Sequence, residues 1–228
     1  PVALQFDLKG PVSAAKLGFD GKAGSVSTRM AGVLDLIGNT MAGLSIKAQA
    51  PHMTLSPALG WESMVLDASL KGRMAAPEGQ ASLDVAQLAA GGAGANTIKL
   101  CFTGDDARKG VAQALRLTLE ADGLKVPGKA PTLLATAPVV LDATWAPQGQ
   151  GMPLDFTVSH PVFAVAGSAR TAAPQKGRLT LTLPDLFPVG QAGGVILPGH
   201  AGMSAQVARP EHAEGGTRLT SEGTLAVT

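Results

Sequence analysis

Apolar and polar residues alternate along much of this chain with the period of two that is typical of β-strands. The clearest example is the segment 115–122, in which the odd positions are Leu, Leu, Leu and Ala and the even positions are Arg, Thr, Glu and Asp. Successive side chains of a strand point to opposite faces of its sheet. The segment therefore predicts a strand with one apolar face and one polar face.

Similar alternation recurs along the whole chain, and the stretch 25–36, which is less regular, predicts either a strand or a brief helix. About a dozen strands result, spaced by roughly 8–12 residues and in places by about 20, close to the spacing of all-β folds. The alternation is regular in 2–9, 44–50, 64–71, 98–102, 139–145, 154–158, 178–183, 203–207 and 219–227, and weaker in 17–19, 53–55, 81–85 and 163–165.

Helices contribute little to the predicted fold, because amphipathic helical patterns of ten or more residues are essentially absent. The apolar faces of the strands must then be buried by a second sheet, by closure of the sheet on itself, or by a ligand held in a long curled sheet. The irregular strand spacing and the repetition favour an open, extendable array. We predict an all-β fold: a long, curled, repetitive antiparallel or mixed β-sheet forming an open hydrophobic groove, with at most short helical turns. Residues 1–228 form one continuous β-repeat segment in this prediction.

Glycine, proline and aspartate mark the turns between the predicted strands. Gly10-Pro11 marks one turn, and Asp20-Gly21 predicts a hairpin turn. The small-residue stretch 86–97 separates two predicted strands, and Gly91-Gly92-Ala93-Gly94 within it predicts a flexible connection. It is not expected to bind phosphate, because it lacks the Lys-Ser/Thr ending of a P-loop and is followed by no helix.

The segment Pro184 to Ala192 separates two alternating strands and carries three large apolar residues, Leu186, Phe187 and Val189. We expect it to form a short plug or lid that packs over one edge of the groove. A segment that points wholly into solvent would contradict this expectation.

The composition narrows the classes of function. Charged residues make up 15% of the 228 residues and the formal net charge is +1, whereas average chains carry about 25% charged residues. A nucleic-acid binder normally shows a basic stripe or patch, so no nucleic-acid partner is predicted. With two Trp, six Phe and no Tyr, the chain lacks stacking surfaces for sugars or single-stranded nucleic acid. Trp61 and Trp145 are expected at the edge of the core or the rim of a groove.

No pattern for catalysis or metal binding stands out. The single cysteine, Cys101, excludes an internal disulfide and a multi-cysteine metal site. Ser168 and Ser204 lack the flanking pattern of a nucleophile elbow, and Asp105-Asp106 lacks the further oxygen ligands of a calcium loop. Carboxylates are spread over turns rather than clustered, which argues against a carbohydrate-active β-helix enzyme. We predict no enzymatic activity, no cofactor and no metal. The histidines are expected in surface turns; they are His52, His160, His200 and His212.

No run of residues approaches the ~20 consecutive apolar positions of a membrane-spanning helix. The chain opens and stops within alternating strands and shows neither an initiator Met nor a signal peptide. We therefore expect it to be a fragment of a longer protein.

The apolar face of the strands remains as the candidate site, and two hypotheses for it stand side by side. It is either an ordinary sealed β core, as in a structural or adhesive β-solenoid or sandwich, or a groove that holds lipid. Aliphatic side chains suit acyl chains, because their contact is non-directional and contributes about 25 cal/mol per Å² of apolar area buried. The second hypothesis assigns the groove lining to Leu115, Leu117, Leu119, Val139, Leu141, Leu154, Phe156, Val158, Leu179, Leu181 and Leu183.

The stretch from Arg178 to Ala208 resembles a recurring segment of the TamB family, in which an outward-polar strand leads into an Asp-Leu-x-Pro turn and then into apolar-x-Leu-x-Gly-x-Ala. AsmA-like relatives share these repeats. The similarity extends in style over most of the chain and is strongest over 80–228. The residues that carry it are Asp185-Leu186, Pro188, Gly194, Leu197, Gly199 and Ala201.

The resemblance implies a periplasmic protein with a long, hydrophobic-lined β-groove, anchored in the inner membrane through a segment that this chain does not contain. It implies phospholipid acyl chains as cargo and an Omp85-type outer-membrane protein as partner, bound through other regions. The implied role is phospholipid transport between the membranes and outer-membrane biogenesis, within a translocation and assembly module.

Overall fold

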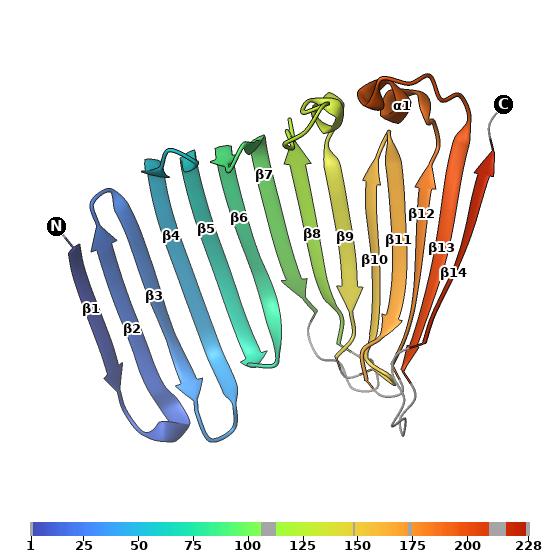
Figure 1. Cartoon of the computed structure of the whole chain (residues 1–228). Coiled ribbons are helices and arrows are strands. Elements are labelled where there is room, and N and C mark those ends of the chain that lie inside the picture. The colour runs from blue at the N-terminus through green and yellow to red at the C-terminus, as the bar shows by residue number, and fades with distance from the viewer. Residues whose placement is uncertain (1, 106–112, 148, 173–174, 210–217, 227–228) are drawn as a thin grey trace.

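One antiparallel β-sheet contains every strand of the described residues, and the strands lie side by side in chain order (Figure 1). The computed structural model describes residues 2–105, 113–147, 149–172, 175–209 and 218–226, with 209 and 218–226 described by their backbone alone. The strands are β1 (Val2–Lys9), β2 (Ala15–Ala23), β3 (Val26–Asp35), β4 (Thr40–Ser56), β5 (Leu59–Arg73), β6 (Ala76–Ala90), β7 (Ala93–Gly104), β8 (Leu115–Asp122), β9 (Val139–Trp145), β10 (Pro153–His160), β11 (Phe163–Arg170), β12 (Gln175–Leu183), β13 (His200–Arg209) and β14 (Arg218–Ala226).

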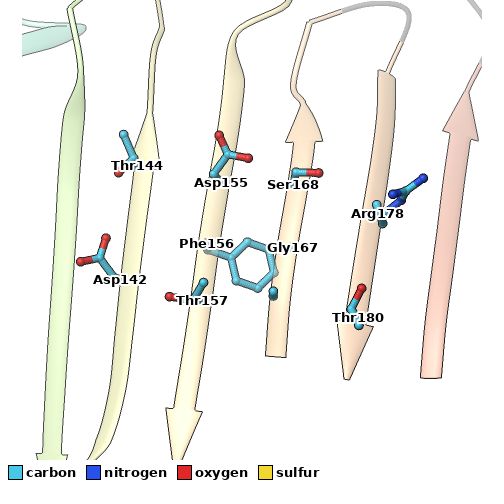
Figure 2. Close-up of a pocket in the computed structure, with 10 residues that line it drawn as sticks. Asp142, Thr144, Asp155, Phe156, Thr157, Gly167, Ser168, Arg178 and Thr180 are labelled. Atoms are coloured by element: carbon cyan, nitrogen blue, oxygen red, sulfur yellow. The ribbon is translucent and has the colours of Figure 1, made fainter. Parts of the chain in front are cut away.

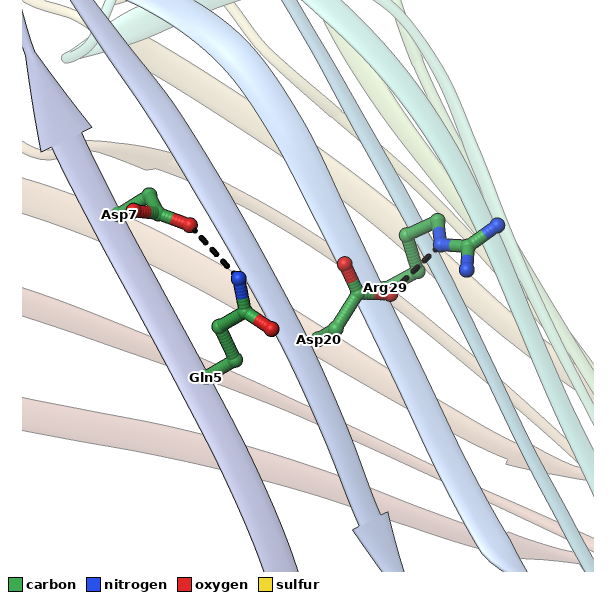
Figure 3. A network of polar contacts seen from close by, with 4 residues as sticks. All are labelled: Gln5, Asp7, Asp20 and Arg29. Carbon is green, nitrogen blue, oxygen red and sulfur yellow. Dashed lines mark hydrogen bonds and ion pairs between the residues drawn. The ribbon is translucent and has the colours of Figure 1, made fainter.

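The sheet has fourteen strands and is not closed, because β1 and β14 form its two edges. Helical structure is limited to two 3₁₀ turns, η1 (Val12–Ala14) and η2 (Leu133–Thr136), and one short helix, α1 (Phe187–Gly193). Seen from beside β1, the strands of the C-terminal half cross behind it at an angle (Figure 3), as expected of a sheet that twists and curls. The predicted all-β class, the open curled sheet and the short helical turns are therefore confirmed, with antiparallel pairing throughout.

The register of the hairpins keeps the alternation in phase from strand to strand. Residues that lie opposite each other in neighbouring strands project to the same face of the sheet. In the pairing of β8 with β9, for example, Leu119 lies opposite Leu141 and Arg116 lies opposite Thr144. Because this correspondence repeats through the sheet, the apolar positions of separate segments form one continuous face.

Two sequence predictions of turns are wrong. Asp20-Gly21 lies inside β2, where Asp20 is paired with both Gln5 and Arg29, and the turn falls at Gly24-Ser25 instead. Gly91-Gly92-Ala93-Gly94 is not a flexible connection, and the stretch 86–97 around it does not separate the strands: β6 continues to Ala90 and β7 begins at Ala93. Gly91 and Gly92 make a two-residue turn with φ of +59° and +88°, the left-handed geometry that tight hairpins require.

The less regular stretch 25–36 is a strand, β3, and not a helix. The weak alternation at 53–55 belongs to a much longer strand, since β4 runs for 17 residues. In both places the ladder of hydrogen bonds to two neighbouring strands decides the structure, whereas the local pattern of the sequence is weak.

The core of the molecule is thin, as expected of a single sheet without a second layer. None of the described large side chains is fully buried. The buried apolar residues are mostly small or lie near strand ends, where turns fold back over the apolar face; they are Ala15, Met41, Ala50, Ala68, Ala76, Val85, Ala95, Leu115, Ala121, Val139, Val162 and Leu186.

Candidate functional site

The face that carries most of the apolar side chains extends from β1 to β13, and the backbone of β14 continues its register. Its two central rows follow from the register of each neighbouring pair. The first row is Phe6, Phe19, Met30, Ile46, Ala68, Ala81, Phe102, Leu117, Ala143, Phe156, Gly167, Leu179, Ala205 and Ser221. The second row is Leu4, Gly21, Thr28, Ala48, Leu66, Leu83, Leu100, Leu119, Leu141, Val158, Val165, Leu181, Met203 and Gly223.

All eleven residues predicted to line a groove lie on this apolar face. Seven of them belong to the two central rows, and the other four, Leu115, Val139, Leu154 and Leu183, lie on the same face nearer the strand ends. Leu115 and Val139 are buried, Leu179 is 36% exposed, and the remaining eight are half-buried. Apart from Leu115, the leucines are therefore only partly shielded, which is not the full burial that a sealed core predicts.

Further residues of the same face were missing from the predicted lining. Phe102 on β7 and Trp145 on β9 lie beside the predicted leucines of the neighbouring strands. Val165 on β11 lies in the second central row. The alternation of apolar and polar residues in the sequence already places these three residues at apolar positions. On β11 it is blurred because Ala164 and Ala166, at the outward positions, are also apolar.

A depression with a volume of about 450 Å³ lies on the apolar face at one end of the strands. The Trp145 side chain lies at this end, where its indole Nε1–H donates to Thr171 Oγ1 at 3.4 Å and Thr171 Oγ1–H donates to the Met152 carbonyl at 2.8 Å. This chain of bonds satisfies the polar atom of the indole and orients its ring beside the depression. The lining consists of Phe102, Leu115, Arg116, Leu117, Ala143, Trp145, Leu154 and Thr171.

The opposite end of strands β9 to β12 is covered by two short helical segments. The turn η2 follows β8, the helix α1 follows β12, and the two segments contact each other over the ends of the strands between them (Figure 1). Three buried side chains, those of His160, Val162 and Leu186, lie at this capped end. The predicted plug at Pro184 to Ala192 therefore does not point wholly into solvent, because Leu186 and Gly190 are buried.

Three of the residues that carry the family resemblance, Asp185, Gly194 and Leu197, have a structural role at the ends of α1 or against it. Asp185 Oδ1 accepts a hydrogen bond from the Phe187 N–H at 2.8 Å, which satisfies a free donor at the start of the helix. Gly194 ends the helix with φ of +80°, and its N–H donates to the Gln191 carbonyl. Leu197 then packs so closely on Gly190 that a Cβ at Gly190 would lie 2.9 Å from the Leu197 Cβ.

The prediction that the histidines lie in surface turns is wrong: His52 lies within β4 and His200 begins β13, although both are exposed, and His160 is not at the surface at all. His160 ends β10 and is buried, its ring stacks on Phe163 at 5.8 Å, and its Nδ1 accepts a hydrogen bond from the Val162 N–H at 3.2 Å. The tight turn after β10 directs the ring back under the cap. His52 is exposed beside Glu62 and His200 is exposed at the start of β13, while His212 lies outside the described residues.

The polar face carries the charges of the sheet, several of them paired across neighbouring strands. Arg29 Nε lies 2.7 Å from Asp20 Oδ1 (Figure 3), and Arg116 pairs with Asp142. The hydrogen bond and the charge of the partner carboxylate raise the pKa of both arginines. Cys101 is exposed on this face, in a row with Ser82 and Thr118, which fits an incidental small residue.

A shallow depression of about 340 Å³ also lies on the polar side of β9 to β12 (Figure 2). Its polar side chains include Asp142, Asp155, Ser168 and Arg178, but they do not assemble a catalytic arrangement. No hydrogen bond between these four side chains is found, and among the described residues no three His, Cys, Asp or Glu side chains approach closely enough to hold a metal ion. Asp106, of the Asp105-Asp106 pair, lies outside the described ranges.

In the part of the chain that the structure covers, no helix has the length and hydropathy to cross a membrane. Comparison of the chain with protein-family models, with characterised proteins and with solved structures finds no match. The resemblance to the TamB family thus rests on the residues of the sequence and stays a prediction.

Proposed function

We propose that the apolar face binds the acyl chains of phospholipids and that the chain acts as a non-enzymatic segment of a lipid conduit. The observation that supports this proposal best is the extent of the face: the register of β1 to β13 brings mostly apolar positions into two neighbouring rows, interrupted by Thr28. A sealed structural core would require a second layer packed on this face, and the described strands all belong to one sheet.

The partial exposure of the face supports an occupant other than the protein itself. Outside the capped end, large apolar side chains such as Leu179, Met203 and Val207 remain 36–42% exposed. Exposed apolar surface is unfavourable in water by about 25 cal/mol per Å². Acyl chains laid against these side chains would remove both surfaces from water without requiring directional contacts.

The dimensions of the sheet suit a conduit better than a single binding site. Fourteen strands spaced by about 4.8 Å give a face roughly 60 Å long across the strands. The hydrocarbon of one bilayer leaflet is about 15 Å thick, half of the ~30 Å core. Several acyl chains, one after another, would fit along the face, each contacting three or four strands.

The cellular setting of the proposal comes from the resemblance to the TamB family. It comprises a periplasmic location, attachment to the inner membrane, an Omp85-type outer-membrane partner and phospholipid movement between the two membranes. The alternative is a structural β-sheet whose apolar face is covered by other protein and carries no lipid.

Native mass spectrometry of the protein isolated from cells without detergent tests the proposal. We expect bound phospholipid, and we expect its loss in Leu117→Glu, which places a charge on the half-buried apolar row. Thr118→Glu is the matched control, because it adds the same charge to the neighbouring residue on the opposite face. Circular dichroism establishes that both variants fold. Absence of lipid from the unmodified protein, or equal lipid in both variants, would contradict the proposal.

A further inference from the structure

Three basic side chains gather on the polar face where β11 ends and β12 begins. Arg170 lies directly opposite Lys176 in the register of these strands. Arg178 lies two residues further along β12, so it projects to the same face, and it is opposite Ser168. All three basic side chains are exposed.

This cluster differs from the arrangement of charge on the rest of the polar face. Basic residues lie opposite each other at two other places, Lys9 opposite Lys16 and Arg29 opposite Lys47. In each of those pairs a base forms an ion pair with an acid: Lys9 lies 3.1 Å from Asp7, Arg29 lies 2.7 Å from Asp20 and Lys47 lies 3.2 Å from Asp67. Like charges directly opposite each other in a sheet are destabilising. Within the described residues no ion pair of Arg170, Lys176 or Arg178 is found.

The cluster also has a shape that suits a compact ligand. A depression of about 410 Å³ contains the three basic residues together with the Ser168 hydroxyl. The aliphatic part of Arg170 packs over Gly151, where a Cβ would lie 3.1 Å from Arg170 Cδ. That contact restrains the direction of the guanidinium. The lining consists of Pro153, Asp155, Ser168, Ala169, Arg170, Lys176, Gly177, Arg178 and Gln206.

We infer that Arg170, Lys176 and Arg178 form a binding site for a phosphate-type oxyanion. Guanidinium groups donate paired hydrogen bonds that match the oxygens of phosphate, and the lysine ammonium adds a third positive charge. The single acid in the depression, Asp155, opposes the anion and limits its affinity. The three basic residues do not belong to the apolar face. Binding of free phosphate to them therefore does not require that the apolar face binds lipid.

A phosphate at this site has two sources, free phosphate in solution and the headgroup of a phospholipid. The second source rests on the proposed function. Thr171 follows Arg170 in the chain and lines the apolar depression beside Leu154, so the basic cluster and the apolar depression lie at the same end of β10 and β11. A lipid whose chain occupied the apolar depression would bring its phosphate around the ends of these strands to the basic cluster.

Titration with inorganic phosphate at low ionic strength, followed by NMR of the backbone amides, tests the site. We expect shifts centred on Ser168 and Arg178, and a dissociation constant at least about tenfold weaker in the double variant K176Q/R178Q, since removing one charge-assisted hydrogen bond weakens binding by about a factor of ten or more. The control K16Q/K22Q removes the same charge from exposed positions on β2. Asp155→Asn is expected to tighten binding.

Equal affinities of the unmodified protein and K176Q/R178Q, or equal weakening in the control, would overturn the inference. Vesicles of phosphatidylglycerol and of phosphatidylcholine then distinguish the two sources. Retention on the anionic vesicles that depends on Lys176 and Arg178 assigns the site to a headgroup, and phosphate binding without such retention assigns it to free phosphate. The variant Leu117→Glu separates this inference from the proposed function, because it is expected to abolish lipid binding and to leave phosphate binding unchanged.

Discussion

The ring of Phe156 on β10 lies over Gly167 on β11, its directly opposite partner, in the space that a side chain at Gly167 would occupy (Figure 2). A Cβ at Gly167 would lie 2.3 Å from Phe156 Cε1. The aromatic ring thus covers a glycine on the neighbouring strand, and the pair keeps the first row of the apolar face continuous where a side chain is missing.

Gly167→Ala is expected to destabilise the protein by about 1–3 kcal/mol, because the methyl group must displace the ring from its rotamer. Gly177→Ala is the matched control on the next strand. There the nearest atom to a new Cβ is 3.6 Å away, so the change should be neutral or stabilising by up to about 1 kcal/mol. Urea denaturation measures the stability of both variants. Equal destabilisation would show that the position of the Phe156 ring does not require a glycine at position 167.

At the capped end, substitutions of two adjacent residues are expected to have very different effects on stability. Leu186 is 6% exposed and Phe187 is 46% exposed. Leu186→Ala should cost about 2–5 kcal/mol, since it leaves a cavity beneath α1, whereas Phe187→Ala should change stability by less than about 1 kcal/mol. Thermal unfolding measures both effects, and hydrogen exchange at the Gly190 amide shows whether the destabilisation is local to α1. A larger loss of stability in Phe187→Ala than in Leu186→Ala would mean that α1 packs against the sheet through Phe187 and not through Leu186.

The edge strand offers a prediction about pH. The side-chain amide of Gln5 donates to Asp7 Oδ2 at 3.0 Å (Figure 3), and Lys9 Nζ lies 3.1 Å from Asp7 Oδ1. These contacts, the Gln5 hydrogen bond foremost, lower the pKa of Asp7 below its ordinary value of 3.8. The contribution to stability is therefore complete above that value and is lost as the pH falls through the lowered pKa.

Carbon-detected NMR titration of the Asp7 carboxyl measures this shift directly. Gln5→Ala should move the pKa of Asp7 up towards its ordinary value, and Lys9→Met should move it in the same direction. Because the pair is exposed, added salt should weaken the effect of Lys9. A pKa unchanged by Gln5→Ala would rule out the hydrogen bond as its main cause.

The predictable part of this structure is the part governed by local alternation. Leu117, Leu119 and Leu141 were assigned to one face because each strand shows a period of two, and the register then aligned these strands. The eleven lining residues follow from the same rule. The residues of the apolar face could therefore be predicted from the sequence. The pairing of the strands, which aligns these residues across the sheet, could not.

Other features depend on contacts that the local pattern does not contain. Asp20-Gly21 has the composition of a hairpin turn, but Phe19 and Asp20 are held in β2 by partners on both sides, including Arg29. His160 adjoins a proline and so predicted an exposed turn. It is buried because η2 and α1, from separate parts of the chain, fold over the same end of the sheet.

The central claim is that the apolar face is open to acyl chains while the polar face is not, and photo-crosslinking in cells tests it most directly. A photoreactive amino acid placed at Leu181 or Leu117 probes the apolar face, and one at Thr180 or Thr118, the neighbouring residues in the same strands, probes the polar face. The account predicts phospholipid adducts from positions 181 and 117 and none from 180 and 118. Adducts to protein alone at 181 and 117, or equal phospholipid capture from both faces, would contradict it.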